Sequence, residues 1–382
     1  MRRKVLIGLA VLLVLVVGAS FGLAWWGSGE AIEPDHRHYT NPDRSNIVRE
    51  VRWSGSTRTV VIGSPNDFAR RLGTHRMVWD GVDATVGPAL AETADTVERP
   101  IVEGPAPSVG TTVAVTGVMI TDPKSTFGFD YTEVMVPTEL GPAPAWRIPA
   151  TGPAEDTWVI AVHGRNARRN AMVAIPAFHR LGLPVLAITY RNDEGAPPAP
   201  DGFLHYGESE YRDVEAAVRY AQGQGARRVV LYGGSMGGMI VGQFLRHSPL
   251  ASTVTATVLD SPLLSMPAVT EHAAGQYGVP PPAAWLSTVL VNWRSGVDLD
   301  ELDLVTHPPA TRPPMLLFGA GADSQAPPRM TRDFVAAAPA LNWPVTYEEF
   351  PGAEHVESWN ADPPRYERAI SGFVSRTVLG RP

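Results

Sequence analysis

The chain has 382 residues, of which 44% are hydrophobic and 19% are charged. This composition can fill the core of one large domain or of two to three smaller ones, and it excludes a largely disordered protein. The net charge of −7 argues against a nucleic-acid-binding protein, and the absence of cysteine excludes thiolate catalysis, disulfides and cysteine-bound metals.

The first 29 residues (1–29) have the pattern of a membrane anchor or a signal peptide. Basic residues at positions 2–4 precede 25 residues without a charged side chain, and about 20 apolar residues are enough for a helix to cross a bilayer. Trp25 and Trp26 would then lie at the far interface. We therefore predict a single-pass transmembrane helix with an extracytoplasmic catalytic domain. The alternative is a secreted protein, because residues 17–19 form an acceptable cleavage site.

The rest of the chain divides by pattern into three parts. Residues 30–47 are polar and turn-rich, which predicts a linker. Residues 48–127 contain β-branched runs between Gly and Pro breaks, which predict a small β-rich N-terminal portion. Over residues 128–382, strand-like runs alternate with amphipathic helices, which predicts an α/β domain with a mostly parallel central sheet and helices on both faces. Its segment 262–312 is long for one crossover and forms either a small cap or ordinary crossover packing.

One short motif indicates chemistry. Residues 233–237 read Gly-Gly-Ser-Met-Gly, directly after an apolar strand-like run and directly before an apolar helical one. A serine in this context lies on a sharp strand-to-helix turn, where flanking glycines leave room for a strained backbone. The start of the following helix adds backbone donors that favour developing negative charge. We therefore predict that Ser235 is a nucleophile; the structural alternative is a glycine-rich tight turn.

This turn resembles the nucleophile elbow of the α/β-hydrolase fold, whose triad follows the chain order serine, acid, histidine. In that order, Asp323 comes just after a strand-like run, and His355 comes after the last one. The resemblance implies that His355 takes the proton of Ser235 and returns it to the leaving group, while Asp323 fixes the tautomer of His355. Asp260 also ends a strand-like run and is the alternative acid.

An oxyanion hole requires two backbone N–H groups directed at one point. One of them should belong to Met236, the residue after the nucleophile. Members of the fold often carry His-Gly in the loop after an early core strand, and here that loop contains His163-Gly164, so the resemblance assigns the second donor to Arg165. The fuller His-Gly-Gly-Gly run of many lipases is absent, and a plain turn is the alternative for this loop.

Residues 141–146, 189–193 and 206–208 are similar to exported or membrane-tethered serine hydrolases near the lysophospholipase-like and prolyl-oligopeptidase-type groups. The resemblance implies a carboxylesterase- or lipase-like enzyme that cleaves esters with an apolar acyl group through an acyl-enzyme. The alternatives are a peptidase or amidase with the same triad, and a catalytically inactive tethered binding protein. We expect a small-molecule or lipid ester as substrate, the membrane as a partner of the N-terminal helix, and neither a metal nor an organic cofactor.

Overall fold

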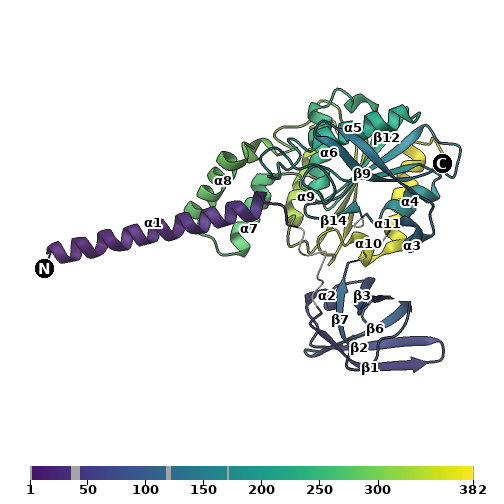
Figure 1. Ribbon diagram of the computed structural model, residues 1–382, viewed down its shortest axis with the longest axis horizontal. Coiled ribbons are helices and arrows are strands. Elements are labelled where there is room, and N and C mark those ends of the chain that lie inside the picture. Colours follow the sequence, from purple (N-terminus) through teal and green to yellow (C-terminus); the bar gives the residue numbers. More distant parts are fainter. Residues whose placement is uncertain (1, 36–43, 118–121, 170–171, 382) are drawn as a thin grey trace.

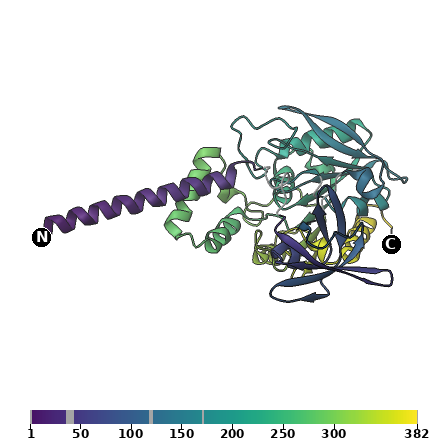
Figure 2. The same cartoon turned by 60° about the horizontal axis from the view of Figure 1, so that its bottom comes forward.

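A computed structural model describes residues 2–35, 44–117, 122–169 and 172–381. It consists of a long N-terminal helix, a β domain and a larger α/β domain (Figure 1). The helix projects away from the α/β domain, and the β domain lies on a different side of the α/β domain (Figures 1 and 2).

Helix α1 (Arg2–Ile32) extends past the predicted end at residue 29, and its last turns pack on the α/β domain. Figures 1 and 2 show this end beside α8 (Pro281–Ser295). Ser28 is fully buried there, and the Arg294 guanidinium donates to its Oγ at 2.8 Å. The C-terminal end of α1 is therefore fixed to the protein by packing and by polar contacts.

The predicted transmembrane helix within residues 1–29 is not supported. Over the part of the chain that the structure describes, no helix has both the length and the apolar character that crossing a membrane requires. Trp25, which we expected at a bilayer interface, lies instead under the Arg294 guanidinium, 4.6 Å from the ring centre. A membrane partner bound through this helix is likewise not supported, whereas secretion stays a prediction from the sequence.

The β domain is a single antiparallel sheet that closes on itself. Its strands pair in the order β2-β1-β7-β3-β4-β6-β5, and a further β2–β6 pairing joins the two sides. Along β3 the side chains of His75, Met77 and Trp79 are buried and the two between them are not, which is the period of two expected of a half-buried strand. This confirms the predicted β-rich portion. The elements are β1 (Asn46–Ser54), β2 (Thr57–Gly63), α2 (Asp67–Arg70), β3 (His75–Trp79), β4 (Val82–Val86), β5 (Ala91–Glu92), β6 (Thr96–Glu103) and β7 (Thr112–Thr116).

The α/β domain is built on an eight-stranded sheet in the order β15-β14-β13-β12-β10-β11-β9-β8. The strands from β10 to β15 run parallel, and the β8–β9 hairpin adds an antiparallel edge next to β11. The strands are β8 (Thr132–Thr138), β9 (Gly141–Ile148), β10 (Thr157–Val162), β11 (Val185–Ile188), β12 (Arg228–Gly234), β13 (Val254–Asp260), β14 (Met315–Ala320) and β15 (Val345–Phe350). The other helices are α3 (Pro123–Phe127), α4 (Ile175–Arg180), α5 (Tyr211–Gly223), α6 (Met236–His247), α7 (Met266–Gln276), α9 (Pro328–Ala337), α10 (Ser358–Ala361) and α11 (Pro363–Thr377).

Helices cover both faces of this sheet, as predicted. Every residue of β10 is buried, because successive side chains enter two different cores. Trp158 and Ile160 join the core formed with α5, α6 and α9, whereas Val159 and Ala161 join the core formed with α4 and α11. This arrangement brings the carboxyl ends of the parallel strands to one edge of the sheet, where ligand sites of such folds lie.

The segment 262–312 folds as α7, α8 and a short 3-10 turn. The Ser265 side chain caps α7, and Gly296 ends α8 with a φ of 73°, a left-handed conformation that favours glycine. On α8, the side chains of Trp285 and Trp293 are 67% and 72% exposed. A role for this segment as a cap over an acyl pocket stays a prediction.

Candidate active site

Ser235 occupies the turn between β12 and α6. Its φ of 52° and ψ of −123° are strained for a residue with a side chain, and such strain is a feature of the nucleophile elbow. The neighbouring strand supports the turn, because the Ser235 N–H donates to the backbone oxygen of Asp260 at 2.9 Å. The Ser235 carbonyl in turn accepts from the N–H of Leu263 at 3.0 Å. The strained conformation is thus held from both sides.

The glycines of the motif are required by close backbone contacts. A Cβ at Gly233 would lie 2.6 Å from the carbonyl oxygen of Gly237. A Cβ at Gly237 would lie 2.7 Å from the carbonyl oxygen of His163, in the loop after β10. Real Cβ atoms are not found at such separations, so a side chain at either position would push α6 away from the sheet and displace Ser235.

His355 follows β15 and reaches both other members of the predicted triad. Its Nε2 lies 2.7 Å from Ser235 Oγ, and its Nδ1 lies 2.8 Å from Asp323 Oδ2. All three residues are at least 91% buried. With Nδ1 protonated, the ring donates to the Asp323 carboxylate and accepts from the Ser235 hydroxyl, which is the arrangement that a general base needs.

The Asp323 carboxylate is oriented by the loop after β14. Its Oδ1 accepts the backbone N–H groups of Gln325 at 2.8 Å and Ala326 at 2.7 Å. These bonds fix the orientation of the carboxylate and keep it directed at the His355 ring. The structure therefore brings together Ser235, Asp323 and His355 from three separate strand ends.

The alternative acid, Asp260, does not hydrogen-bond to His355. It is fully buried at the end of β13, where its Oδ2 accepts from the Tyr366 hydroxyl at 2.9 Å. The Tyr366 hydroxyl is 3.4 Å from that of Tyr232, so two tyrosines of the core shield the carboxyl group from water. Burial raises the pKa of Asp260 to about 6, although the Tyr366 hydrogen bond and the nearby His355 oppose this change.

The two predicted oxyanion-hole donors border Ser235. Met236 is the first residue of α6, and Arg165 lies in the loop after β10. A Cβ at Gly164 would lie 2.9 Å from Ser235 Cβ, so this loop passes directly beside the serine. Among the described residues, the backbone N–H groups of Met236 and Arg165 have no hydrogen-bond acceptor. Both are thus available to a substrate oxygen.

His163 supports this loop and is not part of the triad. Its Nε2 lies 2.7 Å from Asp193 Oδ2, and its ring stacks on Tyr190 with 4.4 Å between the ring centres. The Tyr190 hydroxyl donates to the carbonyl oxygen of Gly164 at 2.8 Å. The sequence alone does not identify Asp193 or Tyr190 as supports of the loop. Both residues lie in the short polar run after β11, which is visible in the sequence. That this run contacts His163 cannot be seen there, because the contact depends on the fold.

The end of α1 also contacts this loop. The Arg165 guanidinium donates to the backbone carbonyl of Glu30, and the side-chain oxygen of Asn166 accepts from the N–H of Asp35 at 2.9 Å. These bonds satisfy backbone groups where α1 ends. They also connect the N-terminal helix to the loop that contains the second oxyanion donor.

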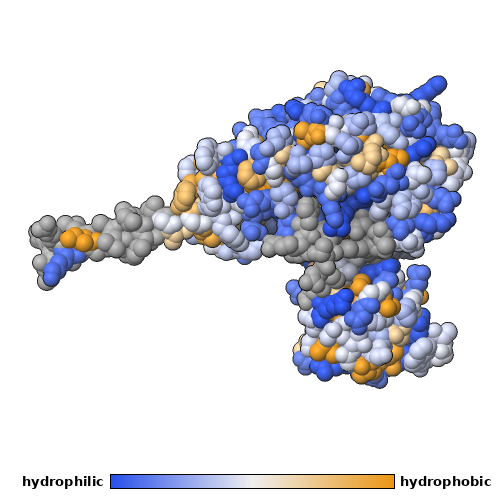
Figure 3. Space-filling view, in the orientation of Figure 1, coloured by the Kyte–Doolittle hydropathy of each residue, from blue (hydrophilic) through white to orange (hydrophobic). Residues whose placement is uncertain are grey.

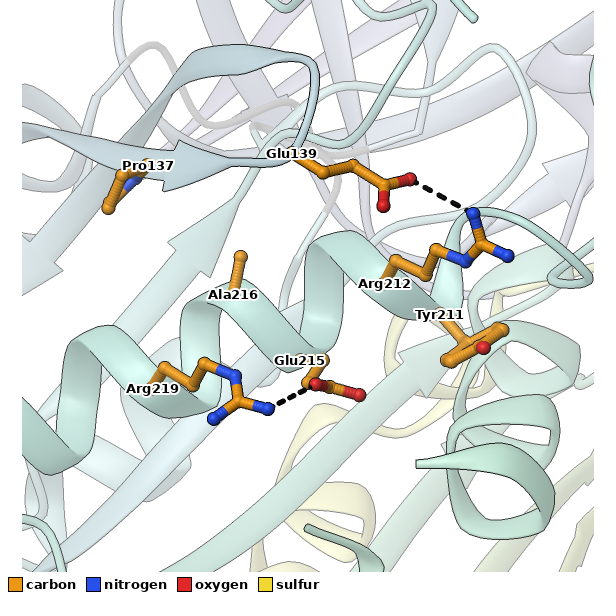
Figure 4. Close-up of a pocket in the computed structure, with 7 residues that line it drawn as sticks. All are labelled: Pro137, Glu139, Tyr211, Arg212, Glu215, Ala216 and Arg219. Carbon is orange, nitrogen blue, oxygen red and sulfur yellow. Dashed lines mark hydrogen bonds and ion pairs between the residues drawn. The ribbon is translucent and has the colours of Figure 1, made fainter. Parts of the chain in front are cut away.

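A surface pocket of about 340 Å³ lies elsewhere, between the β8–β9 hairpin and α5 (Figure 4). None of the residues that line it belongs to the triad. Its two arginines are both paired, Arg212 with Glu139 at 3.3 Å and Arg219 with Glu215 at 2.6 Å. This pocket therefore offers neither a reactive group nor an unpaired charge, and the triad is the stronger candidate site. No cluster of three or more possible metal-ligating side chains occurs among the residues described.

Comparison with known proteins supports the α/β-hydrolase fold predicted from the sequence. Residues 199–380 match the model of the prolyl oligopeptidase family. That region includes all three residues of the triad. A comparison with curated protein sequences finds no match.

Several solved structures share the fold at low sequence identity. An esterase from Pyrococcus furiosus has a TM-score of 0.54 and 20% identity, over 68% of this chain and 95% of the esterase. A puromycin-hydrolysing peptidase from Mycobacterium tuberculosis also has a TM-score of 0.54, with 18% identity over 86% of this chain and 47% of the peptidase. An acylaminoacyl peptidase from Pyrococcus horikoshii has the same score, with 14% identity over 87% of this chain and 56% of the peptidase. The predicted α/β-hydrolase fold is thereby confirmed, and it is the fold of serine hydrolases that include both esterases and peptidases.

Proposed function

We propose that this protein is a serine hydrolase that cleaves carboxylic esters through an acyl-enzyme. The observation that carries the proposal is the pair of contacts made by His355, 2.7 Å to Ser235 Oγ and 2.8 Å to Asp323 Oδ2. A buried imidazole between a serine hydroxyl and a carboxylate is the arrangement that activates a serine for nucleophilic attack.

Each half of the reaction uses the same three side chains. The Ser235 hydroxyl attacks the ester carbonyl as His355 Nε2 takes its proton, and Asp323 stabilises the resulting imidazolium. The tetrahedral intermediate collapses when His355 returns that proton to the departing alkoxide, which leaves as an alcohol. Water then attacks the acyl-enzyme with His355 again as the base, so that the acid product leaves and Ser235 regains its hydroxyl.

The backbone N–H groups of Met236 and Arg165 are proposed to bind the oxyanion of each tetrahedral intermediate. Both lie beside Ser235, and neither has an acceptor among the described residues. Met236 is also the first residue of α6, so the helix dipole favours negative charge there. Loss of one such donor typically lowers kcat by a factor of about 10²–10³.

An ester with an apolar acyl group is the substrate that the surroundings of Ser235 favour. Met236 and Leu263 are buried apolar residues adjoining it, and a Val356 methyl group lies next to Gly234. The match to the prolyl oligopeptidase family favours a second candidate, the hydrolysis of a peptide or aminoacyl amide by the same triad. The two candidates differ in the leaving group and share every catalytic residue.

The experiment uses the full chain and three reagents. A fluorophosphonate probe should label the wild type and not Ser235→Ala, whereas the control Ser287→Ala, in the middle of α8, should be labelled normally. Initial rates on a series of p-nitrophenyl esters of increasing acyl length are then compared with rates on aminoacyl p-nitroanilides. Faster turnover of medium-chain esters supports the ester proposal, and faster turnover of the anilides supports the amide candidate. A wild type that neither reacts with the probe nor hydrolyses any substrate would favour a binding protein.

A further inference from the structure

The β domain contacts the α/β domain immediately beside the turn that carries His355. Residues 71–74, here called the docking loop, connect α2 to β3 and lie against the segment 357–361, which begins two residues after His355. Within this contact, Thr74 and Asn360 bond reciprocally: the Thr74 N–H donates to the Asn360 carbonyl at 2.8 Å, and Asn360 Nδ2 donates to the Thr74 carbonyl at 2.7 Å. The two domains are thus joined by paired backbone and side-chain bonds.

An ion pair lies beside these hydrogen bonds. The Arg71 guanidinium is 2.6 Å from a carboxylate oxygen of Glu357, whose side chain is only 8% exposed. Burial raises the pKa of Glu357, and the facing Arg71 opposes this change. Truncating one partner of such a pair leaves the other charge buried without compensation, which is costly. The contact therefore depends on both residues.

The docking loop is shaped to fit this surface. Gly73 has a φ of 79°, and a Cβ there would overlap the backbone carbonyl of Asn360. Only glycine combines that conformation with so close an approach. Leu72 completes the contact, because a Cβ at Gly352 would lie 2.8 Å from its Cδ1.

Arg99 organises the docking loop from inside the β domain. Its side chain is fully buried and donates to backbone carbonyls, including those of Ala69 and Gly73 at 2.9 Å and Gly87 at 2.8 Å. A further donor reaches the carbonyl of Arg71. A guanidinium has five N–H donors in a fixed plane, so a single side chain can hold several carbonyls in one arrangement. The loop thus meets the α/β domain as a preformed surface.

The turn that receives this contact is strained. Val356, the residue after His355, has a φ of 56°, which is an outlier for a β-branched side chain. Its N–H donates to Ser261 Oγ at 3.1 Å on the side of the sheet. Strained conformations persist only where the surroundings determine them. Here the sheet holds Val356 itself, and the docking loop contacts the chain on both sides of it, at Gly352 and at Glu357.

We propose that the β domain acts as a positioning domain for catalysis, in which Arg71 holds the His355 turn through Glu357. The proposal rests on the proposed function, because it concerns the base of that triad. Neither residue touches the reacting atoms. Arg71 and Glu357 are positioning residues that keep His355 Nε2 within hydrogen-bond distance of Ser235 Oγ.

Loss of the pair should lower the rate of the chemical step more than substrate binding. A misplacement of about 1 Å can cost about 10²-fold in rate, so we expect kcat to fall about ten- to hundredfold in Arg71→Met and in Glu357→Gln, with KM nearly unchanged. The double variant should be no slower than the slower single variant, because both changes remove the same contact. Arg71→Lys, which keeps the charge, should recover part of the lost rate.

The matched control is Arg70→Met. Arg70 precedes Arg71 in sequence but pairs with Glu92 inside the β domain, so its loss should leave kcat unchanged. Rates of fluorophosphonate labelling should follow kcat, since both depend on activation of Ser235 by His355. If Arg71→Met does not fold, the same comparison of kcat and labelling rate is made with Glu357→Gln, which preserves the shape of the side chain.

The outcomes separate this inference from the proposed function. A wild type without labelling or hydrolysis would overturn the proposed function itself. A wild type that is labelled, together with Arg71→Met and Glu357→Gln variants labelled at the same rate, would overturn only the positioning role. Additive losses in the double variant, or a loss confined to KM, would also overturn it, because they would show two independent effects or an effect on binding.

Discussion

Asp260→Asn should make the protein more stable at neutral pH, because the native fold disfavours the charge of this carboxyl group. Asp260 is fully buried at the end of β13, and burial raises its pKa from 3.8 to about 6, even though the Tyr366 hydroxyl donates to it at 2.9 Å. At about 1.36 kcal/mol for each pH unit, this difference corresponds to about 3 kcal/mol of unfolding free energy.

The direction of this pH dependence follows from the pH at which the folded and the unfolded chain each release the proton of Asp260. Below pH 3.8 the group is protonated in both the folded and the unfolded chain. Between pH 3.8 and about 6 the unfolded chain ionises first, so the folded state binds more protons and the free energy of unfolding falls as pH rises. Above that range Asp260 is ionised in both states, so it causes no further fall in the free energy of unfolding. Asparagine abolishes the titration and keeps an acceptor for the Tyr366 hydroxyl.

Urea unfolding of wild type and Asp260→Asn at a series of pH values between 4 and 8 measures this effect. The stability of the variant relative to wild type should rise by about 2.5 kcal/mol across that interval, since the unfolded chain is already partly ionised at pH 4. Asp300→Asn, at an exposed position, serves as the control for removal of a carboxylate. A flat difference would refute the raised pKa of Asp260. A difference that falls with pH would show that the fold favours the charged form, as expected if Asp260 were the partner of His355.

Two further predictions concern catalysis. Asp323→Asn should lower kcat on a soluble ester by on the order of 10⁴, as the equivalent change does in a chymotrypsin-type triad, because it favours the wrong tautomer of His355; an equal loss in Asp260→Asn would contradict the assignment of the acid. Deletion of residues 2–23 should leave kcat on the same ester nearly unchanged. Deletion of residues 2–35 should lower kcat about tenfold, because it removes the Glu30 carbonyl that Arg165 contacts beside Ser235; equal rates for the two deletions would show that α1 does not support the oxyanion loop.

The fold could be predicted, and Ser235, Asp323 and His355 could be proposed as a triad, because their signals are local. The Ser235 turn needs glycines within two residues, and the strands before Asp323 and His355 are apolar runs that are visible in the sequence. Parallel strands then bring their carboxyl ends to one edge of the sheet, so residues at separate strand ends meet there. The contacts of His355 favour Asp323, the acid assigned from the sequence, over the alternative Asp260, and they depend on a ring position that no local pattern specifies.

The contacts that support the site could not be predicted, because they join distant parts of the chain. Arg71 and Glu357 are 286 positions apart. Residues 5–29 contain no charged side chain, which predicted a membrane anchor. The polar contacts that fix the end of this helix come instead from Arg294 and Arg165 in the α/β domain. Neither arginine differs in sequence context from an ordinary surface arginine.

These distant contacts share one feature, which is that they meet the candidate site at two loop segments outside its regular strands and helices. The elbow around Ser235, which itself has a φ of 52°, is fixed by the sheet and by α6. The Arg165 loop and the His355 turn also contain residues at positive φ, Asn166 at 53° and Val356 at 56°. The end of α1 bonds to the first of these segments, and the β domain bonds to the second. Irregular backbone lacks the repeating hydrogen bonds of strands and helices, so its geometry must come from other partners. In this protein the parts that precede the α/β domain supply those partners, which is why we propose that both of them support the geometry of catalysis.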